Sequence, residues 1–220
     1  TEYLRRQDLP LFANTEMTYF PTGEEYLEDL LARLEKAQKF IFLEYYIASK
    51  GQIWDRICKV LAERAADGVE VNLILDDFGS MMTMPPEEIQ ALRQKGIWVQ
   101  MFNPVHHYVN RLYFNYRDHR KIAVIDGDTA YTGGANLADE YANLIVRFGY
   151  WKDCGLRLEG EGAWGFTRQF MYLWLRMGGE LREPWDTYRP CGGSSGSDLC
   201  QPLVDGPDNT PVNTVEDTYQ

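Results

Sequence analysis

The sequence predicts an α/β protein, a layered α/β/α sandwich with a mixed central sheet. Short runs rich in β-branched and aromatic residues alternate with longer runs whose apolar residues recur at helical spacing. In the first half of the chain this alternation reads strand, helix, strand, helix, strand, which is typical of a βαβ layered domain. The chain has 220 residues and is 45% hydrophobic, so it can bury a sizeable core.

Local patterns define each element of the first half. Residues 1–15 have no clear period and are expected to form an irregular N-terminal arm, followed by a short strand over 17–20. Thr22 then caps a helix, because Glu25 completes a capping-box pattern with it, and this helix should end near Ala37. The next elements are predicted from periodicity and from glycine and proline punctuation: strands over 40–47, 69–75 and 97–102, and helices over 51–67 and 85–96.

A β-hairpin in the second half carries the most reactive side chains. The run 122–125 is short and apolar, and Asp126-Gly127 after it favours a tight turn because glycine tolerates positive φ. A return strand over 129–132 would follow. His119 and Lys121 lie two residues apart at the start of the first strand, so their side chains are expected to project from the same face.

An imidazole beside an ammonium group is suited to handling a phosphate. Lysine supplies a compact positive charge for non-bridging oxygens, and histidine, with an ordinary pKa of about 6.5, can act as a neutral nucleophile. Gly133-Gly134 would let backbone amides approach an anion, and Asn136 would add a neutral donor. An exposed hairpin without a function could contain any one of these features. Their combination favours a phosphate site made by His119, Lys121, Gly134 and Asn136.

Two further elements are predicted after the hairpin. Asp153 leads into a strand that alternates through Leu156 and Leu158 and ends at Gly160. A last helix over 161–177 carries an aromatic stripe, which is usually part of a core.

The motif resembles that of a known family. The order His-x-Lys, four residues, Asp, six residues, Gly-Gly-x-Asn over 119–136 is similar to the signature of the phospholipase D superfamily. A resemblance to the bacterial cardiolipin synthase branch is carried by the longer sequence Asp-His-Arg-Lys-Ile-Ala-Val-Ile-Asp-Gly and by Gly-Gly-Ala-Asn-Leu-Ala-Asp-Glu-Tyr after it. Two shorter sequences also resemble this branch: Glu44-Tyr45-Tyr46-Ile47 and Trp151-Lys152-Asp153. The resemblance spans 16–182, which would be a catalytic half containing one phospholipase D-type repeat.

The resemblance implies a reaction and a role for each residue. The reaction would be a phosphatidyl transfer that makes cardiolipin from phosphatidylglycerol through a covalent phosphohistidine, without a metal or other cofactor. His119 would be the nucleophile, while Lys121 and Asn136 would bind the phosphate oxygens. Asp153 would hold the far nitrogen of the histidine ring. Asp126 completes the catalytic motif and fits best as a structural acceptor at the hairpin turn.

The resemblance also implies partners and a location. A second motif supplies the general acid in this family, so the 220-residue chain is expected to be nearly inactive unless a second repeat or a homodimer partner provides it. Residues 183–199 would be a flexible linker, and 200–220 the start of a truncated second repeat. The full-length bacterial protein would act at the cytoplasmic face of the cell membrane. The chain itself is expected to be soluble, because it lacks the run of about 20 apolar residues that spans a bilayer.

Two other functions stay open for the same motif. One is hydrolysis, in which water replaces the acceptor alcohol, and the other is phosphate binding without catalysis. The net charge of −11 argues against a nucleic acid partner. It leaves room for a local basic patch, because Arg111, Arg117, Arg120 and Lys121 cluster near the motif.

Several charged or reactive residues outside the motif have more than one interpretation. Glu44 interrupts an apolar strand, so it is expected to face water, to have an ionic partner or to lie near the site. Asp76-Asp77 suggests a metal site but lacks a matching partner set, and the pair His106-His107 fits a surface or gate loop better than a metal site. Cys191 and Cys200 could close a small loop, although so few cysteines indicate a reducing compartment.

Overall fold

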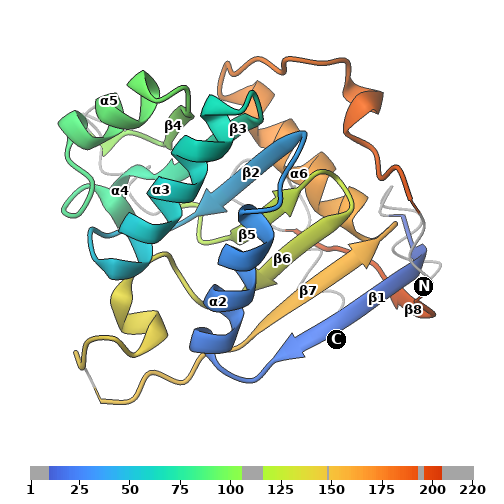
Figure 1. Cartoon of the computed structure of the whole chain (residues 1–220), viewed down its shortest axis with the longest axis horizontal. Coiled ribbons are helices and arrows are strands. Elements are labelled where there is room, and N and C mark those ends of the chain that lie inside the picture. Colours follow the sequence, from blue (N-terminus) through green and yellow to red (C-terminus); the bar gives the residue numbers. More distant parts are fainter. Residues whose placement is uncertain (1–9, 106–115, 148, 193–195, 205–220) are drawn as a thin grey trace.

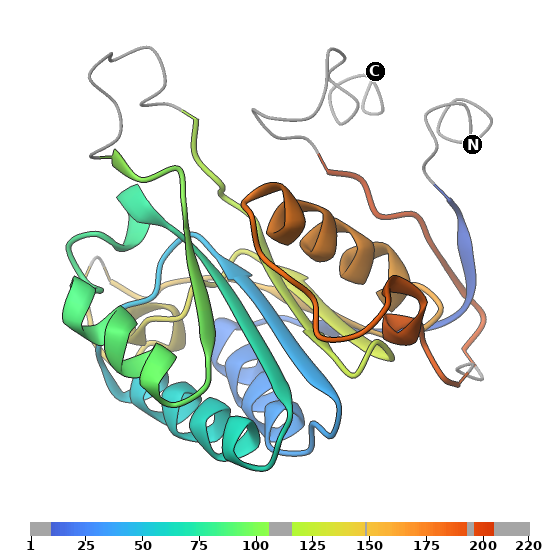
Figure 2. The same cartoon turned by 90° about the horizontal axis from the view of Figure 1, so that it is seen from above.

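The protein is an eight-stranded sheet between two layers of helices, as the computed structural model shows over residues 10–105, 116–147, 149–192 and 196–204 (Figures 1 and 2). The strand order is β4-β3-β2-β5-β6-β7-β1-β8. Strands β4, β3 and β2 are parallel to one another, and every other neighbouring pair is antiparallel. The predicted α/β sandwich with a mixed sheet is therefore confirmed.

The elements follow the predicted order, with boundaries that differ by a few residues. The strands are β1 (Phe12–Phe20), β2 (Phe40–Tyr45), β3 (Glu70–Asp76), β4 (Trp98–Phe102), β5 (Lys121–Ile125), β6 (Thr129–Gly133), β7 (Gly155–Gly160) and β8 (Asp198–Cys200). The helices are α2 (Gly23–Leu34), α3 (Gln52–Ala66), α4 (Asp77–Ser80), α5 (Pro86–Gln94) and α6 (Ala163–Arg176), with 3-10 turns η3 (Asp139–Ala142) and η4 (Trp185–Tyr188). The described helices include none that is both long enough and apolar enough to cross a membrane.

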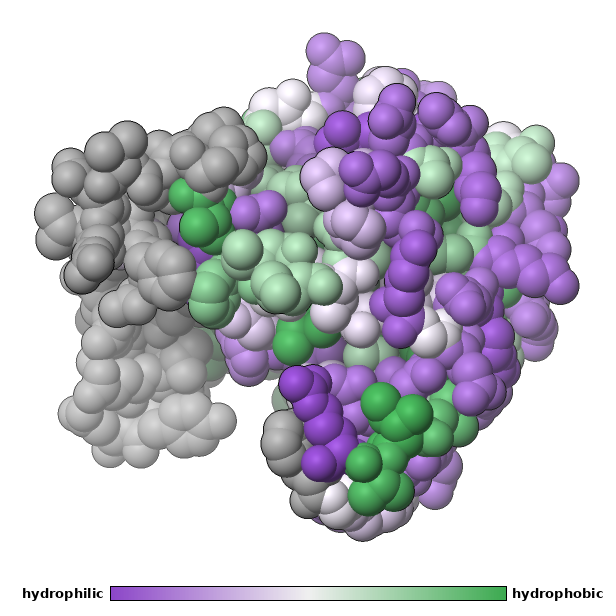
Figure 3. Space-filling model, turned by 90° about the vertical axis from the view of Figure 1, so that its left-hand side faces the viewer, coloured by the Kyte–Doolittle hydropathy of each residue, from purple (hydrophilic) through white to green (hydrophobic). Residues whose placement is uncertain are grey.

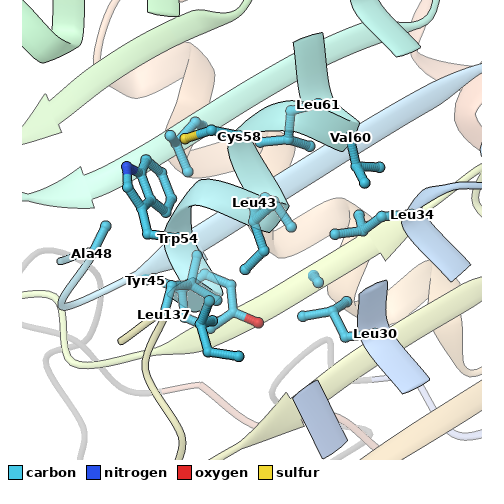
Figure 4. Close-up of a cluster of buried hydrophobic side chains, with 14 of the residues drawn as sticks. Leu30, Leu34, Leu43, Tyr45, Ala48, Trp54, Cys58, Val60, Leu61 and Leu137 are labelled. Atoms are coloured by element: carbon cyan, nitrogen blue, oxygen red, sulfur yellow. The ribbon is translucent and has the colours of Figure 1, made fainter. Parts of the chain in front are cut away.

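The two faces of the sheet bury separate apolar clusters. Along β2, Leu43 points toward α2 and α3, whereas Phe42 points toward α6, where its ring stacks on Phe170. In the first cluster, leucines of α2 meet Trp54 and its neighbours on α3 across Leu43 (Figure 4). Strands covered on both faces read as nearly continuous apolar runs, which explains why alternation is weak in β2 and β3.

Capping at the start of α2 follows the predicted pattern. The Thr22 side chain accepts a hydrogen bond from the N–H of Glu25, as a capping residue does. The helix ends at Leu34 instead of near Ala37.

Asp126 holds the turn between β5 and β6. Its φ of 55° and the 80° of Gly127 lie in the left-handed region. Its carboxylate accepts hydrogen bonds from the backbone N–H groups of Gln38, Lys39 and Phe40 at 2.9, 2.7 and 3.0 Å. Asp126 is therefore the structural acceptor that the sequence predicts. It lies at the opposite end of β5 from Lys121, so it ties the hairpin to β2 and is remote from the predicted phosphate site.

Replacing Asp126 by alanine is expected to destabilise the protein by about 2–4 kcal/mol, because three backbone donors lose their acceptor and alanine is strained at positive φ. Asp126→Asn, which keeps one carbonyl oxygen and tolerates this conformation, should lose less than half as much. Urea unfolding measures both. Equal losses in the two variants would contradict the account of the turn.

Both ends of the described chain differ from the prediction. Strand β1 begins at Phe12, so residues 12–15 belong to the sheet and not to an irregular arm. Within the predicted linker, Tyr188 is buried and its hydroxyl donates to Glu70 at 2.6 Å. A strand was expected over residues 200–204, but β8 covers Asp198–Cys200, where it pairs with β1, and residues 201–204 form no strand. That a second repeat begins at residue 200 stays a prediction. Composition predicted a linker because glycine, proline and serine dominate it, and that signal cannot show a single anchoring tyrosine. Residues 205–220 lie outside the described ranges.

Candidate active site

The predicted phosphate-site residues lie where β2 ends and β5 begins. These two strands are antiparallel, and Tyr45 pairs with Lys121. The carboxyl ends of β2 and β3 meet here, at the edge where open α/β sheets usually bind ligands. Lys121 is only 4% exposed, whereas His119, just before β5, is exposed. The edge therefore presents a reachable imidazole above a buried ammonium group.

Both side chains face the ring of Tyr46. The ring centroids of His119 and Tyr46 are 4.8 Å apart, and Lys121 Nζ lies 5.6 Å from the Tyr46 centroid. The same Nζ donates to the backbone oxygen of His119 at 2.6 Å. The predicted placement of His119 and Lys121 on one face is confirmed. Tyr46 was noticed in the sequence only as part of a family-like run, because nothing local marks it as a neighbour of a residue more than 70 positions away.

Burial and neighbouring charges set both protonation states. Burial lowers the pKa of Lys121 to about 8, and the Asp118 and Asp153 carboxylates partly oppose that shift. Partial burial and the Lys121 charge lower the pKa of His119, while Asp118 opposes them. At neutral pH the imidazole is therefore mostly neutral and the lysine mostly protonated. A nucleophile and an oxyanion-binding cation need these states.

Asp153 enters the site at the start of β7, against Gly134. Its Oδ1 accepts from the Cys154 N–H at 2.8 Å, and its Oδ2 accepts from Trp151 Nε1 at 3.3 Å. Its charge acts on Lys121. In the described ranges, no hydrogen bond joins Asp153 to His119, and the carboxylate that acts electrostatically on the imidazole is Asp118. The role of Asp153 in holding the imidazole stays a prediction.

Gly134 has a different role from the predicted one. A Cβ at this position would lie 2.2 Å from Asp153 Oδ1, so the glycine allows the carboxylate to pack against the backbone. The N–H of Gly134, which was predicted to bind phosphate, donates to the carbonyl of Cys154 at 3.1 Å. This hydrogen bond continues the pairing of β6 with β7, and it occupies the amide that the prediction required.

Gly134→Ala is expected to destabilise the protein by about 1–3 kcal/mol, because the new methyl group would push the Asp153 carboxylate out of its place. The matched control is Gly192→Ala, since no atom lies within 4 Å of a Cβ placed there. Thermal unfolding of both variants measures the difference. A Gly134 variant as stable as the Gly192 variant would contradict the tight packing of Asp153.

Asn136 lies just behind the site and is committed mainly to structure. The buried side chain accepts from the Ile47 N–H at 3.0 Å and donates to the Tyr141 hydroxyl at 2.9 Å. One hydrogen of the amide nitrogen remains for a ligand after these bonds. Asn136 thus connects the end of β2 to η3, and its role as a phosphate donor stays a prediction.

A buried charge network lies on the opposite face of the sheet from Lys121. Arg120 Nε contacts Glu44 Oε1 at 2.7 Å and Asp118 Oδ1 at 2.9 Å. Glu44 therefore has an ionic partner and lies near the site, two of the alternatives that the sequence left open. Because Arg120 sits between His119 and Lys121 in sequence, its anchoring fixes the backbone from which both project.

Asp76 and Arg117 extend this network. Asp76 accepts from the Asp118 N–H at 2.8 Å and from Arg117 at 3.3 Å. Arg117 and Arg120 are thus paired with carboxylates, so the predicted basic patch is wrong for these two residues. Asp77 accepts from the Val105 N–H. Within the described residues, no group of three His, Cys, Asp or Glu could hold a metal ion.

Three remaining predictions concern the histidine pair, Arg111 and the two C-terminal cysteines. The pair His106-His107 and Arg111 lie outside the described residues. Cys191 and Cys200 are both free thiols, so the disulfide considered for them is not formed.

Comparison with known proteins places this site in a family. The family model described as "Cardiolipin synthase, PLD-like domain" matches residues 30–145, which include β2, β3 and the whole β5–β6 hairpin. The chain belongs to the phospholipase D superfamily, in its cardiolipin synthase branch. The resemblance seen in the motif is therefore confirmed over more than half of the chain.

Similar proteins are longer than this chain. An uncharacterized protein of Streptococcus mutans is 45% identical over 174 residues, covering 79% of this chain and 38% of the relative. A cardiolipin synthase of Listeria welshimeri is 34% identical over 200 residues, covering 90% of this chain and 41% of the relative. The chain thus spans about two fifths of the length of these relatives.

Solved structures show the same fold at low sequence identity. NucT from Helicobacter pylori has a TM-score of 0.52 at 14% identity, covering 74% of this chain and 94% of that protein. The phosphatidylserine synthase of Haemophilus influenzae has a TM-score of 0.57 at 15% identity, covering 72% of this chain and 38% of that protein. The phospholipase D-type sandwich is thus common to proteins with different names.

Proposed function

We propose that the full-length protein is a phosphatidyltransferase that makes cardiolipin from phosphatidylglycerol at the cytoplasmic face of the cell membrane. The unprotonated ring nitrogen of His119 attacks the phosphorus and forms a P–N bond. The bond between phosphorus and the headgroup glycerol breaks, and the glycerol oxygen takes a proton from a general acid. A hydroxyl of a second phosphatidylglycerol then attacks the phosphorus, loses its proton and restores free His119.

One observation carries the proposal: an exposed imidazole and a buried ammonium group face the same tyrosine ring, at the edge where open α/β sheets usually bind ligands. The lowered pKa of His119 favours the neutral ring that a nucleophile needs. The ammonium can bind non-bridging oxygens and offset the charge that develops on them. His119 is open to solvent, which disfavours a purely structural role. The cardiolipin synthases among the relatives support the choice of substrate.

Protonation of the leaving group needs a second acid, and in the part of the chain that the structure describes no second histidine lies at the site. Of the three histidines only His119 stands in a His-x-Lys sequence. We propose that a second repeat or a second copy of the chain supplies the acid across a twofold axis. The 220 residues alone would then transfer phosphatidyl groups very slowly. A monomeric preparation with full activity would contradict this division of roles.

Product analysis tests the reaction type. Full-length protein is incubated with vesicles containing phosphatidylglycerol labelled in both glycerol units. The transferase predicts labelled cardiolipin and free glycerol in equal amounts. Phosphatidate with free glycerol would instead show that water is the acceptor and that the protein is a phospholipase D-type hydrolase. Binding of phosphatidylglycerol without turnover would indicate the phosphate-binding alternative.

The rate of phosphoryl transfer to His119 is expected to depend on pH as a bell-shaped curve. The rate rises with pH as His119 loses its proton, at a pKa below its usual value of about 6.5. It falls above about pH 8, where Lys121 loses its own proton and with it the charge that binds the phosphate. Single-turnover rates from pH 5 to 10 with a soluble diester measure both limbs. In Lys121→Arg, which keeps its charge, the alkaline limb should move to higher pH, and an unchanged limb would contradict the assignment.

A further inference from the structure

The loop that connects η3 to β7 projects beside the site. Its neck is the pair Asn143 and Trp151, which are hydrogen-bonded to each other. Asn143 ends η3 with a φ of 51°. Its side chain accepts from the Trp151 N–H at 2.7 Å and donates to the Trp151 carbonyl at 3.0 Å. These two bonds close the loop at its base, and Figure 1 shows it at the lower left of the molecule, beyond the ends of the strands.

The tip of this loop is apolar and faces solvent. Leu144, Ile145 and Val146 are consecutive and are 45%, 48% and 82% exposed, and Tyr150 on the return side is 65% exposed. A space-filling view from this side shows a group of strongly hydrophobic residues at the lower edge of the molecule (Figure 3). In an amphipathic strand or helix, three consecutive side chains do not all face solvent, so three consecutive exposed aliphatic residues do not fit either pattern. They therefore indicate a contact surface.

The charge of this segment differs from that of the chain. Residues 141–152 contain Arg147 and Lys152 and no Asp or Glu, in a chain whose net charge is −11. Arg147 also contacts Glu140 at 3.2 Å, just before the segment. An aliphatic tip with an aromatic residue and cations behind it is the composition of segments that enter the interface of an anionic bilayer. Acids also lie close to this loop, since Glu140 is paired with Arg147 and Glu24 accepts from the Asn143 side chain at 2.9 Å. The exposed apolar tip, and not net charge, is therefore the main reason to expect a lipid surface here.

The same loop is joined to the site residues by direct contacts. Trp151 at its neck donates to Asp153, and its ring lies 5.0 Å from that of Tyr141. The Tyr141 hydroxyl in turn accepts from Asn136. A surface that holds the tip would therefore lie next to the elements that carry the site residues.

We propose that residues 144–146 insert into the surface of an anionic phospholipid bilayer and place the site at the level of the lipid headgroups. This rests on the proposed function only for the identity of the substrate as a lipid. The apolar tip would enter the acyl boundary, while Arg147 and Lys152 would stay at the phosphate level. The loop is thus a membrane contact that needs no spanning helix.

Vesicle sedimentation of the 220-residue chain tests the proposal. The vesicles contain phosphatidylglycerol and phosphatidylethanolamine at physiological salt. The test variant replaces Leu144, Ile145 and Val146 by serine, and the matched control replaces the exposed leucines Leu175 on α6 and Leu199 on β8 by serine. The partition coefficient should fall on the order of tenfold or more in the test variant, because three aliphatic side chains no longer enter the acyl boundary. The control should bind as the parent chain does.

Additional variants distinguish a loss of membrane contact from misfolding and from a loss of self-association. Val146→Asp changes the most exposed tip residue alone and should weaken binding even if the triple variant folds poorly. Equal binding by the tip variants and the parent would overturn the proposal, as would a loss of self-association in ultracentrifugation without a loss of vesicle binding. His119→Gln should still sediment with vesicles. A phosphoenzyme that survives in that variant would contradict the proposed function and leave the loop unaffected.

Discussion

Replacing His119 by glutamine is expected to abolish covalent labelling of the protein by a phosphodiester. The best probe is bis(p-nitrophenyl) phosphate, because nitrophenolate leaves as a stable anion and needs no general acid. The 220-residue chain should release about one equivalent of nitrophenolate in a burst and retain a p-nitrophenyl phosphoryl group, because only one of the two aryl ester bonds breaks, even if its turnover with lipid is very slow. In His119→Gln the burst should disappear into the background. Among the described residues the other side chain shown facing Lys121 is Tyr46, and burial raises the pKa of its hydroxyl, so it is a poor nucleophile near neutral pH.

Lys121 separates nucleophilic attack from charge stabilisation. Lys121→Met should keep the stoichiometry of the burst and slow it by roughly 10²–10³-fold, because the imidazole remains but the buried cation opposite the phosphate oxygens is lost. A burst in His119→Gln at the parent rate would contradict the assignment of the nucleophile. A Lys121→Met burst at the parent rate would contradict the role of the ammonium group.

Replacing Arg120 by methionine is expected to destabilise the protein by about 3–5 kcal/mol. Arg120 is the cation between the buried carboxylates of Glu44 and Asp118, at 2.7 and 2.9 Å. Without it, the carboxylates remain in a region of low dielectric constant without their guanidinium partner, and this usually costs more than the pair itself contributes. Urea unfolding at pH 7 measures the loss.

A double-mutant cycle with Glu44 gives the control. Glu44→Gln removes one of the two charges, so Glu44→Gln with Arg120→Met should be more stable than Arg120→Met alone by about 1–3 kcal/mol. The matched surface control is Arg56→Met, which removes the exposed pair of Arg56 with Glu28 and should cost about 1 kcal/mol or less. Additive effects of the Glu44 and Arg120 changes would contradict the buried network.

The parts of the fold that local sequence determines could be predicted. The β5–β6 hairpin follows from an apolar run before Asp126-Gly127, and the start of α2 from the Thr22 capping pattern. The two-residue spacing of His119 and Lys121 was enough to place them on one face, because strand periodicity is a property of the backbone. The role of Asp126 also followed from its place at the turn.

The parts that depend on distant segments could not be predicted. Glu44 and Arg120 are 76 positions apart, and only the pairing of β2 with β5 brings them together. The same holds for Gly134, because the close approach of the Asp153 carboxylate, which a Cβ at this position would block, comes from a segment distant in sequence. Tyr188 shows the limit in the opposite direction, since this residue is buried within η4, in a segment whose composition predicts a linker.

Mapping the phosphoryl group tests the central claim most directly. The parent chain is quenched in alkali after the burst with bis(p-nitrophenyl) phosphate, because phosphohistidine survives alkali and is lost in acid. Peptide mass spectrometry then locates the adduct. The account predicts one adduct, on the imidazole of His119, which acid removes. An adduct on Lys121 or any other residue, or a burst that leaves no adduct, would show that His119 and Lys121 do not act together on a phosphorus centre.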